Sequence, residues 1–100
     1  MDFHSGNWLL TPADPSDLIF SSAAAVTVVL TVRWTGFALA PISLGVQVNG
    51  TAPPNATLSG TTGEAARTFR LASVNTINLV ATGNWAQFTS IYGDYQITVS

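Results

Sequence analysis

The chain has 100 residues, the size of one ordinary domain, and we predict a single domain over residues 1–100. Only 8% of the residues are charged, against about 25% in typical globular domains. The net charge is −2 and the sequence has only three Lys or Arg residues, so a nucleic-acid binder that relies on phosphate contacts is not expected. The sequence contains no cysteine, which excludes disulfides, thiol catalysis and cysteine-ligated metal sites within these residues.

The first predicted elements are a short strand and a turn. Asn7 to Leu10 is predicted as a short edge strand. Asp14-Pro15-Ser16-Asp17 is predicted as a turn, because proline fixes φ and the two aspartates are able to bond local backbone groups. The same two aspartates are also considered as a weak calcium site, although calcium needs about six oxygen ligands and few other acids lie nearby.

The strongest pattern follows between Ser21 and Gly36. Apolar residues recur there at every second position. They are Val26, Val28, Leu30, Val32 and Trp34. This period of two, carried by β-branched residues, predicts a half-buried strand with Trp34 in the core rather than a helix. The uncharged stretch between Asp17 and Arg33 has 15 residues and includes serine and threonine, whereas a membrane-spanning helix needs about 20 apolar residues, so we expect no membrane insertion.

A second alternating segment, Ile42 to Val48, predicts another strand, and Asn49-Gly50 after it is a tight-turn signal. A further edge strand is expected near Ala56 to Ser59, in a turn-rich stretch.

The last third of the chain contributes three more predicted strands. They are Thr68 to Leu71, Asn75 to Thr82 and Tyr95 to Val99, with a long connection from Gly83 to Asp94 before the last one. About seven short strands at regular spacing predict an all-β domain built as an antiparallel two-sheet β-sandwich.

A resemblance refines this fold prediction. Residues 68–84 resemble a strand–turn–strand region of immunoglobulin-like modules in bacterial surface and phage structural proteins, and the residues that fit its pattern are Leu71, Asn75, Thr76 and Ile77. The closing strand, Tyr95 to Val99, resembles the last strand of the same fold. The resemblance implies an immunoglobulin-like sandwich with an adhesive or structural role, and it offers no catalytic residues. A jelly roll is the alternative fold.

The candidate binding residues come from an aromatic-rich segment, residues 84–95. They are Trp85, Phe88, Tyr92, Asp94 and Tyr95. Aromatic rings beside polar side chains suit sugar stacking with hydrogen bonding, or a protein-binding hot spot. The alternative interpretation is that the rings fill the end of the sandwich.

Catalysis is not expected. His4 is the only histidine, it falls in a terminal segment expected to be mobile, and no motif supplies it with a partner. We therefore predict that the chain is not an enzyme and that it has no catalytic residues, no metal site and no cofactor.

Two functional hypotheses follow. The first is a non-catalytic structural or assembly module of a virion or cell surface, which acts through protein–protein contacts and forms a homo-oligomer, because scarce charge favours the pairing of surfaces. The second is a carbohydrate-binding module or lectin that uses residues 84–95. Both place the protein on a virion, outside the cell or at the cell surface.

Overall fold

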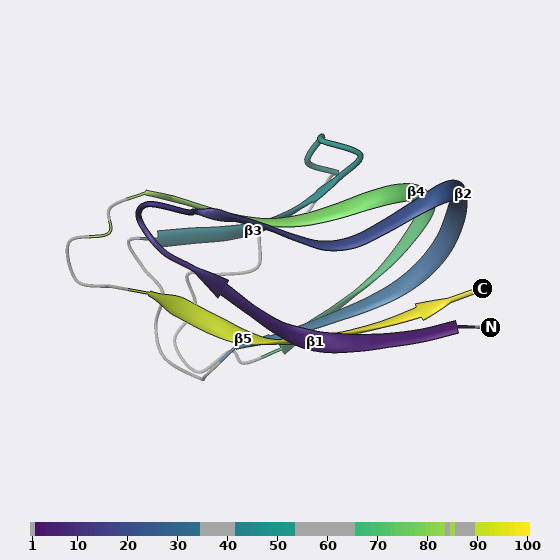
Figure 1. Ribbon diagram of the computed structural model, residues 1–100, viewed down its shortest axis with the longest axis horizontal. Helices are drawn as coiled ribbons and strands as arrows, with labels where there is room; N and C mark the ends of the chain where they lie inside the picture. The colour runs from purple at the N-terminus through teal and green to yellow at the C-terminus, as the bar shows by residue number, and fades with distance from the viewer. Residues whose placement is uncertain (1, 35–41, 54–65, 84, 86–89) are drawn as a thin grey trace.

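The computed structural model describes residues 2–34, 42–53, 66–83, 85 and 90–100, and the side chains of Trp34 and Ile42 lie outside what it describes. These residues form five strands and no helix (Figure 1). The strands are β1 (Asp2–Leu10), β2 (Ser16–Trp34), β3 (Ile42–Val48), β4 (Ala66–Gly83) and β5 (Ile91–Val99). No helix in these ranges is long and apolar enough to cross a bilayer.

The strands belong to one open antiparallel sheet in the order β1-β5-β2-β4-β3. The predicted all-β, antiparallel class is therefore confirmed. The division into two separate sheets is not seen in the described residues, and neither the immunoglobulin-like nor the jelly-roll type is confirmed. The expected edge strand near residues 56–59 and the side chain of Trp34 lie outside the described part of the chain.

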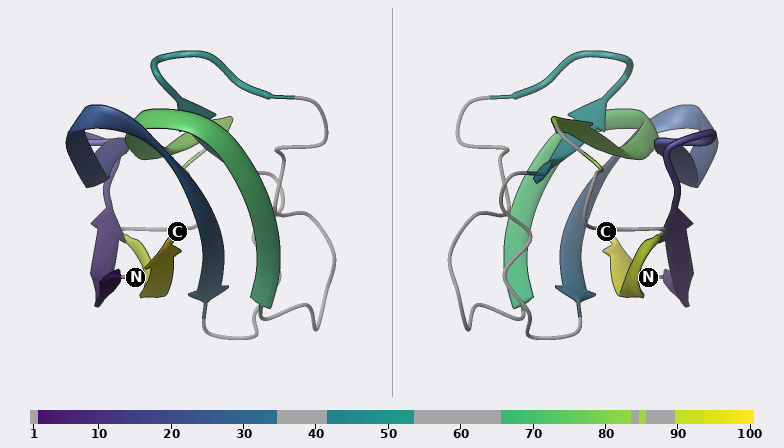
Figure 2. Two further views of the ribbon diagram at one scale, coloured as in Figure 1. Left: turned by 90° about the vertical axis from the view of Figure 1, so that its right-hand side faces the viewer. Right: turned by 90° about the vertical axis from the view of Figure 1, so that its left-hand side faces the viewer.

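Two long strands give this single sheet two layers, because β2 and β4 both bend and pass from one layer into the other (Figures 1 and 2). In the first layer the beginning of β2 pairs with the end of β4, which also pairs with β3. In the second layer the end of β2 lies between β5 and the beginning of β4, and β1 adds to β5. The segments predicted as two strands, 68–71 and 75–82, are parts of one continuous strand, β4.

The bend itself consists of register irregularities and one side-chain clamp. Pairing of β2 with β4 shifts between Ser21 and Val26, and Ser73 on β4 has a positive φ of 58°. Asn49 stabilises this kink: its Oδ1 accepts hydrogen bonds from the backbone nitrogens of Asn75 (2.8 Å) and Thr76 (3.1 Å), and its Nδ2 donates to the Ser73 carbonyl (2.9 Å). The turn expected between residues 71 and 75 is thus a kink within β4, stabilised by the side chain of Asn49, which lies outside that strand.

Asn49 also forms the turn that the sequence predicted. Asn49 and Gly50 both have positive φ, 54° and 81°, as a type I′ hairpin turn requires. Val48 and Thr51 exchange both backbone hydrogen bonds around them, at 2.8 and 3.0 Å. The predicted turn at Asp14 to Asp17, in contrast, lies earlier: Thr11 and Asp14 bond each other, and β2 has already begun at Ser16.

The core lies between the two layers and is apolar: among the described residues, no polar or charged one is buried. Its largest fully buried side chains come from all five strands. They are Trp8, Leu10, Val28, Leu30, Leu44, Ile77, Leu79, Ile91 and Ile97. Val28, Leu30 and Val32 follow the predicted alternation on β2, which confirms that this strand buries one face.

Two glycines give room to the aromatic rings on the inner face of the β1–β5 pair. Trp8 lies opposite Gly93, and Tyr95 lies opposite Gly6. A Cβ atom at Gly6 would stand 2.7 Å from the Tyr95 hydroxyl oxygen and 3.0 Å from Cζ, so the phenol occupies the space that any other residue would fill. Such pairs of an aromatic ring with a glycine help to fix register between strands.

Candidate functional site

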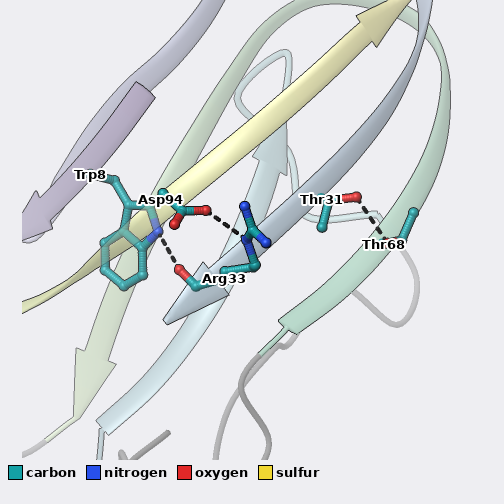
Figure 3. A network of polar contacts seen from close by, with 5 residues as sticks. All are labelled: Trp8, Thr31, Arg33, Thr68 and Asp94. Atoms are coloured by element: carbon teal, nitrogen blue, oxygen red, sulfur yellow. Dashed lines mark hydrogen bonds and ion pairs between the residues drawn. The ribbon is translucent and has the colours of Figure 1, made fainter. Parts of the chain in front are cut away.

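Polar contacts on the two faces of the second layer tie four strands together (Figure 3). Arg33 on β2 donates from Nε to Asp94 Oδ1 on β5 at 2.9 Å, and both side chains are about half exposed. The Trp8 indole donates to the Arg33 carbonyl at 3.1 Å, and the hydroxyls of Thr31 and Thr68 bond at 3.0 Å. An exposed ion pair of this kind contributes about 0–1 kcal/mol, so its main effect is on strand alignment.

The predicted binding residues do not share one surface. The expected connection from Gly83 to Asp94 is shorter than predicted, because β5 begins at Ile91. Tyr92 and Asp94 project from the outer face of β5, whereas Tyr95, an odd number of residues away, projects from the inner face and packs against the core. Trp85 is half-buried and also packs against the core, and Phe88 lies outside the described residues.

An exposed apolar pair lies on the outer face beside this network. Leu9 on β1 is directly opposite Tyr92 on β5, and their side chains are 55% and 51% exposed. Phe3, 62% exposed, lies on the same face at the other end of β1. Soluble proteins do expose single apolar residues, but an adjacent pair on one face of a sheet makes a candidate contact surface.

A groove opens at the bend, between β1 and the beginning of β2, with a volume of about 610 Å³. Its polar and aromatic lining consists of Asp2, Phe3, His4, Ser5, Phe20, Ser21, Ser22 and Tyr95, and Ile19, Val26 and Val99 add apolar lining. His4 and Phe20 meet edge to face across it, with ring centroids 5.7 Å apart and planes at 70°. His4 is therefore not in a mobile terminus as predicted, because it pairs with Ile97 in β1 and its ring is held.

One pattern in the sequence does point to this groove. Asp2, His4, Trp8 and Leu10 are spaced by even numbers, so they lie on one face of a strand that begins at Asp2. The other wall was not predictable from periodicity, because Ile19 and Phe20 are adjacent and both buried. A register shift between Leu18 and Phe20 turns both side chains inward.

Metal-binding side chains do not gather in the described part of the chain: no group of three His, Asp or Glu residues there could hold a metal ion. Asp17, considered with Asp14 as a calcium ligand, instead places Oδ2 at 3.5 Å from the Leu9 backbone nitrogen. Thr11 Oγ1 accepts from the Asp14 backbone nitrogen at 3.0 Å.

Comparison with known proteins gives a fold likeness but no family. No protein-family model matches the chain, and no curated protein matches its sequence. Among solved structures, the fold is similar to that of a protein from work titled "Bacillus endospore appendages form a novel family of disulfide-linked pili". The TM-score is 0.64 with 16% sequence identity, over 98% of this chain and 82% of that chain. At this identity the likeness concerns the fold.

Proposed function

We propose that this chain is a non-catalytic structural subunit of an extracellular or cell-surface assembly, and that it acts through contacts with copies of itself. The observation that carries the proposal is the exposed Leu9–Tyr92 pair on the outer face of the sheet. The fold likeness to a pilus protein of endospore appendages supports a role of this kind, and the resemblance to immunoglobulin-like surface modules implies the same class. The virion location predicted from the sequence has no counterpart in that likeness.

The surface chemistry suits self-association. Near Leu9 and Tyr92 the charges of Arg33 and Asp94 are paired with each other, so two copies meet with little charge repulsion. Fully burying a leucine or aromatic side chain is worth about 1.5–3 kcal/mol, which makes this pair the largest apolar contribution available on the face.

The assembly that we propose differs in one respect from the pili named in the comparison. Those are described as disulfide-linked, whereas this chain has no cysteine. Contacts between copies of this chain are therefore non-covalent. We expect them to reverse on dilution and to be unaffected by a reducing agent.

Sedimentation velocity over a wide concentration range, with negative-stain electron microscopy, tests the proposal. The wild-type chain is expected to assemble as its concentration rises, equally with and without dithiothreitol. Tyr92→Ser is expected to weaken association by about tenfold or more, because losing 1.4 kcal/mol corresponds to a factor of ten.

Phe3→Ser is the matched control, because it removes another exposed ring from the same face, roughly 20 Å away along β1. It is expected to leave assembly unchanged. A wild-type chain that stays monomeric at every concentration would contradict the proposal. Equal assembly of Tyr92→Ser and wild type would place the contact elsewhere on the molecule.

A further inference from the structure

We propose that the groove between β1 and the beginning of β2 is a binding site for a short neutral saccharide. This site is separate from the proposed assembly surface: it lies at the bend of the sheet, and Leu9 and Tyr92 are not among its lining residues. It is also a different place from the aromatic segment 84–95: of the residues described in that segment, Tyr95 alone lines the groove.

The shape and the lining of the groove fit a sugar. Its volume of about 610 Å³ falls in the range of pockets that enclose small ligands, about 300–1,000 Å³. Three of the rings that line it come from three different strands: the exposed His4 and the half-buried Tyr95 offer surfaces for the C–H face of a sugar ring, and the buried Phe20 ring packs against His4. The hydroxyls of Ser21 and Ser22 lie beside them and are able to bond sugar hydroxyls.

The charge of the groove favours a neutral ligand. Among the described residues that line the groove, Asp2 is the only aspartate, glutamate, lysine or arginine. A sulfated, phosphorylated or carboxylated ligand would meet no arginine there, and a cationic ligand would meet a single carboxylate. The hydroxyl groups of a neutral sugar carry no charge. Because they both donate and accept hydrogen bonds, they are able to bond to serine, histidine and aspartate side chains.

The backbone around the groove disfavours an added peptide strand. An extended peptide needs a regular free edge with evenly spaced N–H and C=O groups. The groove wall formed by β2 carries register shifts between Leu18 and Phe20 and between Ser21 and Val26. Ser22 Oγ also donates to the Ala24 carbonyl at 2.7 Å, which occupies one acceptor of this wall. Irregularities of this kind protect strand edges from pairing.

The ring positions are fixed before any ligand arrives. The His4 and Phe20 rings hold each other edge to face, and the Tyr95 phenol rests over Gly6, where a Cβ would stand 2.7 Å from its hydroxyl oxygen. Gly6→Ala would therefore displace the Tyr95 ring and change the shape of the groove, although the substitution replaces none of the lining residues named above.

The test is an array of neutral glucose-, galactose-, mannose- and N-acetylglucosamine-based oligosaccharides, followed by an NMR titration of the full chain with the best binder. Amide shifts are expected at the lining residues of β1 and β2. Ser21→Trp fills the groove and is expected to weaken binding by about tenfold or more, with an unchanged melting temperature. Ser43→Trp, the same change at an exposed strand serine outside the groove, is the matched control and is expected to bind like wild type.

Where Ser21→Trp does not fold, His4→Ala replaces it, because this exposed side chain is tolerant of truncation. The proposal is overturned by an array with no binder, by shifts that map away from the groove, or by equal affinity of Ser21→Trp and wild type. Binding of unmodified peptides in the groove without any saccharide binding would also overturn it. Tyr92→Ser is expected to bind the saccharide like wild type, so failure of the assembly proposal is seen separately.

Discussion

Removing the Asn49 side chain is expected to destabilise the bend on which the whole sheet depends. Asn49→Gly retains the ability to adopt the positive φ of 54° and removes only the three hydrogen bonds to the kink in β4. A hydrogen bond contributes about 0.5–1.5 kcal/mol net, and these three are exposed, where water replaces part of what is lost. We therefore expect the free energy of unfolding to fall by about 1–2 kcal/mol for Asn49→Gly.

Asn49→Ala separates the backbone contribution from the side-chain contribution. Alanine loses the same hydrogen bonds and is also forced into the left-handed region, at a cost of about 1–2 kcal/mol. The alanine variant is therefore expected to be less stable than the glycine variant. This order reverses the usual preference for alanine over glycine inside a regular element.

Urea denaturation followed by tryptophan fluorescence measures both changes, and calorimetry should show a loss of roughly 4–8 °C in melting temperature per kcal/mol for a domain of this size. Asn78→Ala is the control. The hydrogen bond seen for its side chain, to Ser16 Oγ, is long at 3.5 Å, so its effect should stay within about 0.5 kcal/mol. A loss of less than about 0.5 kcal/mol for Asn49→Gly, or a more stable alanine variant, would refute the clamp.

Three further substitutions test the core and the polar network. Leu30 is fully buried on β2, so Leu30→Ala should lower the free energy of unfolding by about 2–5 kcal/mol in the same urea assay. Leu18→Ala, at a half-exposed site on the same strand, should lower it far less. Equal losses for the two variants would contradict the assignment of the inner face. Trp8→Phe removes the hydrogen bond to the Arg33 carbonyl and part of a buried ring, so we expect a loss above 1 kcal/mol, and an unchanged stability would show that this contact is dispensable. Asp94→Asn should change the free energy of unfolding by about 1 kcal/mol or less, and the difference from wild type should vanish in high salt. A larger loss that does not depend on salt would show that the ion pair with Arg33 does not account for the effect of the substitution.

Much of the strand content could be predicted from the sequence, because local alternation records which face a strand buries. Ile42–Val48 was predicted with the bounds that the structure has, and Val28, Leu30 and Val32 are buried as their spacing predicts. The Asn49-Gly50 turn was also predicted, since its conformation depends on those two residues.

The bend could not be predicted because it has no local signature. The kink at Ser73 occurs at a residue that is neither glycine nor asparagine, and the side chain that bonds to its carbonyl lies 24 positions earlier in the chain. The pairing of β1 with β5 is likewise set by contacts between the two ends of the described chain. The groove depends on both features, so periodicity along one strand at a time does not predict it. The same approach grouped Tyr92, Asp94 and Tyr95 as one candidate surface, whereas the structure places Tyr95 on the opposite face of β5 from the other two.

The continuity of β2 and β4 through both layers has a consequence for how the molecule opens. In a sandwich of two independent sheets, one sheet is able to fray while the other keeps its hydrogen bonds. Here any local unfolding of the first layer also disturbs β2 and β4 where they continue into the second layer. The most slowly exchanging amides should therefore form one group that spans the bend and share a single opening free energy, so that the domain behaves as one cooperative unit without a separable half.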